Sequence, residues 1–337
     1  NRPLYVRFRQ IRKTEHGGRT HLGSGSNIEV ILDFSENLNP FPPSFYWNPD
    51  GISVNSYPDN RYATLKEHIA RIEGRRPNEI CVGNGSVEII RSFCLAAVRP
   101  GDNVYVPPHT FGEYAFSVEC AGGIVGTRQD ECEAEFFCNP NNPTGSLVQK
   151  ENVLKKIKAH EDSDSLLFID EAFIDLADPA ESVTSVRSEH TFVLRSLTKA
   201  FAVPGIRFGW GVGSPDLVAA IEAIRPPWSV NAYAENYAHA ALDNADQLGL
   251  SRYRIAGERS FLAGELQTRG ISVCPSAVNF LLFRSPVRAS DLKARFLSCG
   301  ILIRDCTSFG LPEYVRIAVR TREENITFLE ALDTCLP

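Results

Sequence analysis

The sequence predicts an α/β protein with a large domain, in which helices cover both faces of a mostly parallel mixed sheet, and a smaller α+β domain at the C-terminal end. Three observations predict this fold. Apolar, strand-like stretches alternate with amphipathic stretches between residues 79 and 213. Turns rich in Gly, Pro and Asn follow these strand-like stretches. After residue 270 short strand-like and helix-like stretches alternate again, with different spacing.

The individual elements follow from local patterns. Residues 28–34 are strand-like, and residues 64–74 have helical periodicity and end at a glycine. Strands are expected within 79–86, 103–108, 134–140, 165–172, 191–198 and 208–213. Helices are expected at 87–98, 112–123 and 150–160, followed by a long helical stretch from residue 232 to about 270. Continuous apolar strands of this kind are typical of parallel sheets that are buried on both faces.

Composition limits the classes of function. The chain has 337 residues and a net charge of −6, which gives no overall basic surface for nucleic acid or an anionic membrane. No apolar run reaches the roughly 18 residues of a membrane span. The nine cysteines include no C-x-x-C pair, which argues against a disulfide framework or a zinc site and favours a reducing, cytoplasmic location. We therefore expect a small-molecule ligand and no metal.

The residues with the clearest chemical potential follow predicted strands. Lys199 lies in the segment RSLTKAFAVPGIRFGW, and Asp170 ends the apolar stretch LLFID. The turn segments GNGS (83–86) and NPNNPTG (139–145) also follow strands. Ligands of open α/β sheets bind beyond the carboxyl ends of the strands. A dinucleotide-binding dehydrogenase would need G-x-G-x-x-G after its first strand, which GNGS does not supply.

Four blocks together resemble fold type I pyridoxal-phosphate (PLP) enzymes of the class I/II aminotransferase group. They are YPDNRYATLKEHIA, GNGSVEII, CNPNNPTG with DEAF, and SLTK with PGIRFGW, and the resemblance runs over about residues 30–330. It implies the PLP transferase fold and PLP as the cofactor. It also implies an N-terminal segment (1–45) that covers the active site, a large PLP-binding domain (46–250) and a small C-terminal domain (251–337).

The resemblance assigns roles around the cofactor ring. Lys199 resembles the lysine that binds the cofactor covalently and then moves protons at the substrate Cα. Asp170 resembles the carboxylate that keeps the pyridine nitrogen protonated. Asn142 resembles the hydrogen-bond donor to the phenolic oxygen, and Tyr114 the aromatic residue that stacks on the ring. Phe173 departs from the group, which commonly has a tyrosine there, and packing is the alternative interpretation for it.

The cofactor phosphate is expected at the start of a helix. Backbone N–H groups and the helix dipole favour an anion at such a place. The residues that the resemblance assigns to the phosphate are Gly85, Ser86, Ser196, Thr198 and Arg207. Tyr57 resembles the tyrosine that reaches the cofactor phosphate of a neighbouring subunit, which implies a homodimer with shared sites.

The segments HGG, LDFSENLNP, LIRDC and RIAVRT look like L-threonine-O-3-phosphate decarboxylases of cobalamin biosynthesis, and histidinol-phosphate aminotransferases are the near alternative. Both subfamilies bind a phosphorylated amine, so anion-binding residues beyond those of the cofactor are expected. We assign to the substrate His16, Ser35, Asn142, Arg304, Arg316 and Arg320. Decarboxylation is favoured over transamination. A non-catalytic binding protein or regulator on this fold is a remote alternative, because the basic N-terminal stretch is too short for a helix-turn-helix.

Overall fold

The computed structural model describes Thr14, His16, residues 32–129 and residues 131–336. Its larger part is a seven-stranded sheet in the order β2-β8-β7-β6-β5-β3-β4. The pairs from β7 through β4 are parallel, whereas β8 is antiparallel to both β7 and β2. The mostly parallel mixed sheet that the sequence predicts is therefore confirmed.

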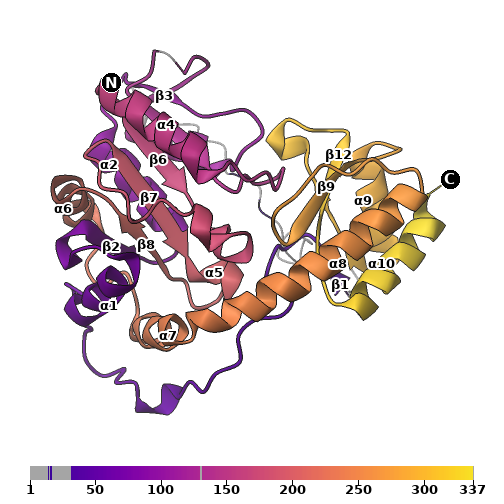
Figure 1. Cartoon of the computed structure of the whole chain (residues 1–337), viewed down its shortest axis with the longest axis horizontal. Coiled ribbons are helices and arrows are strands. Elements are labelled where there is room, and N and C mark those ends of the chain that lie inside the picture. Colours follow the sequence, from indigo (N-terminus) through magenta and orange to yellow (C-terminus); the bar gives the residue numbers. More distant parts are fainter. Residues whose placement is uncertain (1–13, 15, 17–31, 130, 337) are drawn as a thin grey trace, which may run out of the picture.

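The strands of this sheet are β2 (Ile80–Gly83), β3 (Asn103–Tyr105), β4 (Ile124–Gly126), β5 (Ala134–Cys138), β6 (Leu166–Asp170), β7 (Thr191–Ser196) and β8 (Gly209–Val212). The helices around it are α1 (Ala63–Glu73), α2 (Ser86–Ala97), α3 (Glu113–Ala121), α4 (Lys150–Asp162), α5 (Leu197–Ala200), α6 (Pro215–Ile224) and α7 (Ala232–Asp243) (Figure 1).

Alternation along β6 explains why helices cover both faces of the sheet. Phe168 packs in a cluster with Phe93 of α2, whereas Leu167 and Ile169 pack in a separate cluster with Val153 of α4. Successive side chains of a strand point to opposite faces, so an apolar run without polar gaps must be covered twice.

The C-terminal part is built on a three-stranded antiparallel sheet in the order β11-β12-β9. Its strands are β9 (Phe280–Arg284), β11 (Arg304–Asp305) and β12 (Tyr314–Ala318), and its helices are α8 (Leu248–Thr268), α9 (Ala289–Ser298) and α10 (Arg322–Cys335). The short strand β1 (Leu32–Asp33) pairs in parallel with β10 (Ile301–Leu302). The strand predicted over 28–34 is described only from residue 32 onward.

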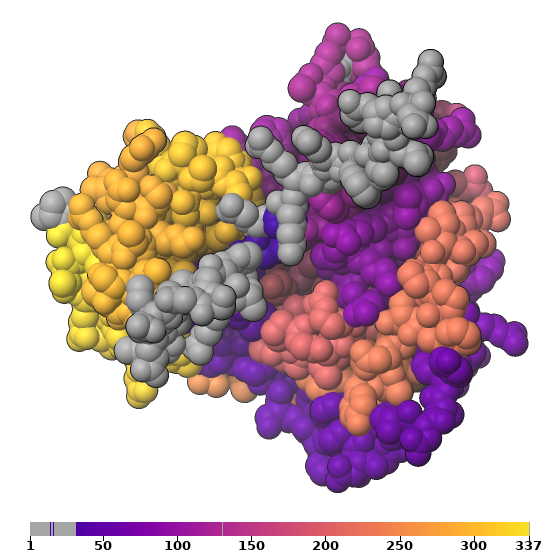
Figure 2. Space-filling view, turned by 180° about the vertical axis from the view of Figure 1, so that it is seen from behind, coloured from indigo at the N-terminus to yellow at the C-terminus, as the bar shows by residue number. Residues whose placement is uncertain are grey.

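Helix α8 connects the two parts (Figure 1). Leu248 and Ile255 in its first half pack in the core cluster of α1, α7 and β8, whereas Leu262 and Leu266 pack in the core of the small sheet. Figure 2 shows the C-terminal part, in orange to yellow, gathered in one lobe beside the larger one. The expected limit between residues 250 and 251 falls within this helix, and the domain limits stay a prediction.

Candidate functional site

A cavity of about 680 Å³ lies where the two parts meet, beyond the carboxyl ends of β5, β6 and β7. The large part contributes residues that follow these strands and the first turn of α2. The small part contributes residues of β11, β12 and the turn at 307–309. Of the predicted N-terminal segment, Thr14, His16 and residues 35–38 line the cavity. The cavity therefore lies where the sequence predicts a ligand.

Lys199 lines this cavity from α5, directly after β7. Burial lowers its pKa from 10.5 to about 8, and the charges of Arg316 and Arg207 act in the same direction, while Glu36 opposes them. No hydrogen bond or ion pair to the Lys199 ammonium is found among the described residues. A buried amine with a lowered pKa is more often unprotonated near neutral pH, and the role of Lys199 in binding the cofactor stays a prediction.

Asp170 ends β6 and is 4% exposed. Its Oδ2 accepts a hydrogen bond of 2.6 Å from the Tyr114 hydroxyl, and its Oδ1 accepts one of 2.9 Å from the backbone N–H of Ala172. Burial raises the pKa of Asp170, and these two donors oppose that increase. A cationic ligand atom against this carboxylate would stabilise its charged form further.

Tyr114 lines the cavity from the first turn of α3, and its stacking on the cofactor ring stays a prediction. Its ring stacks on Phe136, at 4.8 Å between centroids, and its hydroxyl is used by Asp170. The half-buried Phe111 also lines the cavity and meets the Tyr114 ring edge to face. The start of α3 at Glu113 explains this difference in burial, because the helix turns Tyr114 into the core and leaves Phe111 in the loop before it.

Asn142 and Arg316 meet across the two parts of the chain. Arg316 Nη1 donates a short hydrogen bond to Asn142 Oδ1, and Nη2 donates one of 2.8 Å to the carbonyl oxygen of Ser35. Burial lowers the pKa of Arg316 to about 10, and Arg304 contributes to the decrease. Ser35 is held in place by Asp33, whose Oδ1 accepts from both the N–H and the hydroxyl of Ser35.

Arg304 and Arg316 lie directly opposite each other in the register of β11 and β12. Both are buried, at 6% and 4% exposure, and both line the cavity. Arg304 Nη2 donates 2.7 Å to the hydroxyl of Ser308, and the guanidinium lies over the Phe309 ring. Like charges directly opposite each other on a sheet are destabilising. The pair therefore favours an anionic ligand in the cavity.

The residues predicted for a phosphate gather around the start of α2. Gly85 precedes this helix with φ of 78°, a left-handed value that glycine adopts without strain. A Cβ at Gly85 would lie 2.3 Å from Nη2 of Arg207, so the backbone must approach this guanidinium closely. Ser86, Ser196, Thr198 and Arg207 all line the cavity. Backbone N–H groups, hydroxyls and one guanidinium are the donors that suit a phosphate, so the residues present fit a phosphate-bearing cofactor.

His16 lines the cavity but faces a carboxylate. Its Nε2 lies 3.0 Å from Glu113 Oε1, and Thr14 also donates to that oxygen. Arg91 Nη2 lies 3.1 Å from Glu113 Oε2. These partners hold the pKa of Glu113 at about 2, against the effect of burial. The contact of His16 with a substrate phosphate stays a prediction.

Two predicted site residues lie elsewhere. Arg320 does not line the cavity. Its Nη2 pairs with Glu324 Oε1 at 2.6 Å and its Nη1 donates to the carbonyl oxygen of Asp33. These donors are therefore used within the protein, and the contact of Arg320 with a substrate stays a prediction. Tyr57 also lies outside the cavity of its own chain, is 80% exposed and stacks on Trp228 at 4.5 Å.

Phe173 is 4% exposed and meets Phe280 edge to face at 5.2 Å, which agrees with the packing interpretation. It also lines the cavity, together with Glu36, a residue that the sequence argument missed. Within residues 32–129 and 131–336, and at the two described N-terminal positions, no group of three or more His, Cys, Asp or Glu is placed to hold a metal ion. No helix of the described residues is long and apolar enough to cross a membrane.

Comparisons with known proteins agree on one family. Residues 48–332 match the family "Aminotransferase class I and II". The chain is 30% identical to a histidinol-phosphate aminotransferase of Symbiobacterium thermophilum, over 92% of this chain and 91% of that protein. It resembles the crystal structure of the histidinol-phosphate aminotransferase from Clostridium acetobutylicum, with a TM-score of 0.80, 28% identity and coverage of 90% and 98% of the two chains. It also resembles the L-threonine-O-3-phosphate decarboxylase from Porphyromonas gingivalis, with a TM-score of 0.77, 25% identity and coverage of 90% and 99%.

Proposed function

Since the chain belongs to the class I and II aminotransferase family, whose members are PLP-dependent enzymes, we propose that it decarboxylates a phosphorylated amino acid of the L-threonine O-3-phosphate type. One observation carries the choice of substrate. Arg304 and Arg316 are a buried pair of arginines that face each other across β11 and β12 and both line the cavity. A substrate with both a carboxylate and a phosphate brings two anionic groups to this pair and offsets the repulsion between the guanidiniums.

The chain's own residues have distinct tasks in this proposal. PLP, when bound, withdraws electrons from the substrate Cα and so weakens its bonds. Asp170 would hold a proton on the pyridine nitrogen, and the Tyr114 hydroxyl orients the carboxylate and favours its charged form. Lys199 delivers a proton to Cα after carbon dioxide has left. Its lowered pKa, about 8, allows the amine to give and take protons near neutral pH.

Positioning is the second task. Arg316 is held between Asn142 and the carbonyl oxygen of Ser35, so its guanidinium has little freedom to follow the substrate. We assign it to the substrate carboxylate and Arg304 and His16 to the phosphate. Gly85, Ser86, Ser196, Thr198 and Arg207 are proposed to hold the cofactor phosphate. We also propose Phe111, in place of Tyr114, as the aromatic residue against the cofactor ring, because Phe111 lines the cavity from the loop before α3.

Histidinol-phosphate aminotransferase is the second candidate, because the relative and the structure of that name are 30% and 28% identical to this chain. In that reaction Lys199 would remove the proton from Cα, and the arginine pair would serve the phosphate of one substrate and the carboxylates of the other. The same cavity residues are used, so the two reactions differ in which bond at Cα is broken.

We further propose a homodimer in which Tyr57 reaches the cofactor phosphate of the neighbouring subunit. Two observations support it. Tyr57 does not line the cavity of its own chain and is 80% exposed. Tyr46, Val54 and Trp228 are exposed apolar residues in the same or adjoining segments, at 85%, 66% and 45% exposure. An exposed apolar surface of this kind is typical of protein–protein contacts.

Product analysis tests the proposed reaction. PLP-loaded protein is incubated with L-threonine O-3-phosphate, and separately with histidinol phosphate and 2-oxoglutarate. Carbon dioxide and aminopropanol phosphate from the first mixture, without glutamate from the second, are the expected products. Glutamate from the second mixture, with no carbon dioxide from the first, would contradict decarboxylation and establish the aminotransferase. L-threonine without phosphate is the matched control, and its equal turnover would contradict recognition of the phosphate.

A further inference from the structure

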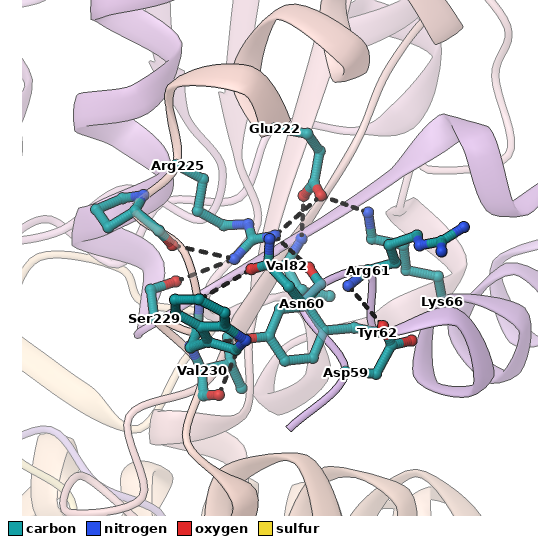
Figure 3. Close-up of polar contacts among 12 residues, drawn as sticks. Asp59, Asn60, Arg61, Tyr62, Lys66, Val82, Glu222, Arg225, Ser229 and Val230 are labelled. Atoms are coloured by element: carbon teal, nitrogen blue, oxygen red, sulfur yellow. Dashed lines mark hydrogen bonds and ion pairs between the residues drawn. The ribbon is translucent and has the colours of Figure 1, made fainter. Parts of the chain in front are cut away.

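A network of polar contacts lies outside the cavity, close in the sequence to the exposed Tyr57 (Figure 3). It joins residues 59–62, directly before α1, to residues 225–230, between α6 and α7. We call Asn60, Tyr62, Arg225, Trp228 and Val230 the clasp. None of them lines the cavity, and no role in the site has been given to them so far.

The clasp fixes two segments to each other through reciprocal contacts. The Asn60 Oδ1 accepts a hydrogen bond of 2.8 Å from the Trp228 N–H, and the Asn60 carbonyl oxygen accepts one of 2.8 Å from Arg225 Nη2. The Tyr62 hydroxyl donates to the Val230 carbonyl oxygen at 3.0 Å and accepts from the Val230 N–H at 3.2 Å. The Arg225 guanidinium lies over the Tyr62 ring, at 4.9 Å from its centre.

The backbone of the clasp is held in an unusual conformation at two places. Tyr62 has φ of 48° and Trp228 has φ of 55°. Left-handed values are uncommon for bulky residues and persist where the surroundings impose them. Here the partners are the contacts just described, together with bonds from Arg225 Nη1 to the Pro226 carbonyl oxygen and the Ser229 hydroxyl. The conformation places the Trp228 ring against Tyr57, at 4.5 Å and 30°.

The clasp is also fixed to the strand that leads to the phosphate end of the cavity. Glu222 accepts from Arg225 Nη2 at 3.3 Å and from Lys66 Nζ at 2.6 Å. Its other oxygen accepts from the Val82 N–H at 3.3 Å. Val82 belongs to β2, which ends two residues before Gly85. Asn60 and Tyr62, which follow Tyr57 closely in the chain, are thereby connected to a strand of the central sheet.

We infer that Asn60, Arg225 and Trp228 are positioning residues that hold Tyr57 in the orientation needed by the active site of the partner subunit. This inference rests on the proposed homodimer with shared sites. Tyr57 is 80% exposed in its own chain, and stacking on Trp228 restricts the ring before the partner binds. A side chain that is already ordered binds its ligand with a smaller entropic cost.

The first test measures the dissociation constant of PLP by titrating the visible absorption band of the lysine-bound cofactor. Tyr57→Phe, Trp228→Ala and Asn60→Ala are each expected to raise this constant by about 3- to 10-fold, the loss of about one hydrogen bond. Trp228→Phe, which keeps a ring against Tyr57, should recover most of the affinity. Tyr253→Ala, which removes another exposed aromatic side chain from α8, is the control and should not change it.

The double variant Tyr57→Phe/Trp228→Ala separates a positioning role from a merely structural one. If Trp228 acts through Tyr57, the double variant should bind PLP no more weakly than Tyr57→Phe alone. Losses that add would overturn the inference. An unchanged constant in Trp228→Ala and Asn60→Ala, with Tyr57→Phe weakened, would overturn it and leave the shared site standing. An unchanged constant in Tyr57→Phe would contradict the shared site itself.

Mixed dimers show which subunit is affected. In the first mixed dimer, one subunit is wild type and the other carries Trp228→Ala and Lys199→Ala. The site that keeps Lys199 then receives Tyr57 from the subunit with the altered clasp, so PLP binding should be weakened. In the second mixed dimer, one subunit carries Trp228→Ala and the other carries Lys199→Ala. The site that keeps Lys199 then receives Tyr57 from the subunit with the intact clasp, so PLP binding should be normal. The opposite pattern would show that the clasp acts within its own chain and would overturn the inference.

Discussion

Replacing Lys199 by methionine is expected to stabilise the cofactor-free protein at neutral pH. Burial lowers the pKa of Lys199 from 10.5 to about 8, and the nearby arginines add to this effect. One unit of pKa difference corresponds to about 1.4 kcal/mol. The folded state therefore binds the Lys199 proton about 3 kcal/mol more weakly than the unfolded chain does. Methionine has a similar length and no charge, so the free energy of unfolding should rise by up to about 3 kcal/mol below pH 8.

The pH dependence of this gain follows from the direction of the shift. Between pH 8 and 10.5 the unfolded chain still binds the proton and the folded chain does not, so wild-type stability rises with pH through this window. The advantage of Lys199→Met should shrink over the same range. Urea unfolding of the cofactor-free proteins near neutral pH and at about pH 10 measures it. Lys155→Met, at an exposed position of α4, is the control. A gain of equal size at both pH values, or no gain near neutral pH, would refute the reasoning.

Three further changes test other parts of the site. Gly85→Ala places a Cβ 2.3 Å from Nη2 of Arg207 and should weaken PLP binding by about 10-fold or more in a titration; an unchanged constant would count against the phosphate cradle. Arg316→Lys keeps the charge but loses one of the two hydrogen bonds that the guanidinium donates. It should raise KM for the phosphorylated amino acid by about 10-fold, while the dissociation constant of PLP stays within about 2-fold. A change in PLP binding alone would contradict the assignment of Arg316 to the substrate carboxylate. Glu113→Gln should lower the free energy of unfolding at pH 6 by about 1–3 kcal/mol. Because folding lowers the pKa of Glu113 from 4.5 to about 2, this loss should disappear as the pH falls through that range. A loss that persists near pH 2 would contradict the contacts of the Glu113 carboxylate with His16 and Arg91.

The central sheet could be predicted because its strands are buried on both faces. β6 begins with four consecutive apolar residues and β7 contains three, and both stretches are followed by turn residues. β4 is not predicted, because Ile124–Gly126 offers only two apolar residues between glycines, and all three of its residues are exposed or half-buried. Its pairing with β3 depends on the neighbouring strand rather than on its own sequence.

The directions of individual side chains were harder to predict. Val315 and Ile317 pack in the small core, so alternation along β12 turns Arg316 the other way, into the cavity. The sequence carries that signal. Arg320 follows the end of the strand, and Glu324 four residues later offered an i,i+4 partner that the sequence argument did not weigh against a substrate role.

Phe111 and Tyr114 show the same difficulty within one turn. Both are aromatic, lie close together in the segment HTFGEY and line the cavity, and the sequence does not show that the Tyr114 hydroxyl is used by Asp170. The clasp is a second example. Its contacts join residues separated by 165 and 168 positions, so no local pattern around Tyr57 predicts that Arg225 and Trp228 lie near this segment.

The proposed chemistry requires that PLP is attached to Lys199. The most direct measurement is reduction of the PLP-loaded protein with borohydride, which makes the lysine–cofactor bond permanent, followed by digestion and mass spectrometry of the peptides. We expect the cofactor on the peptide that contains Lys199. In Lys199→Ala the corresponding peptide should carry no cofactor. Cofactor on another lysine, with the Lys199 peptide unmodified, would contradict the proposed chemistry.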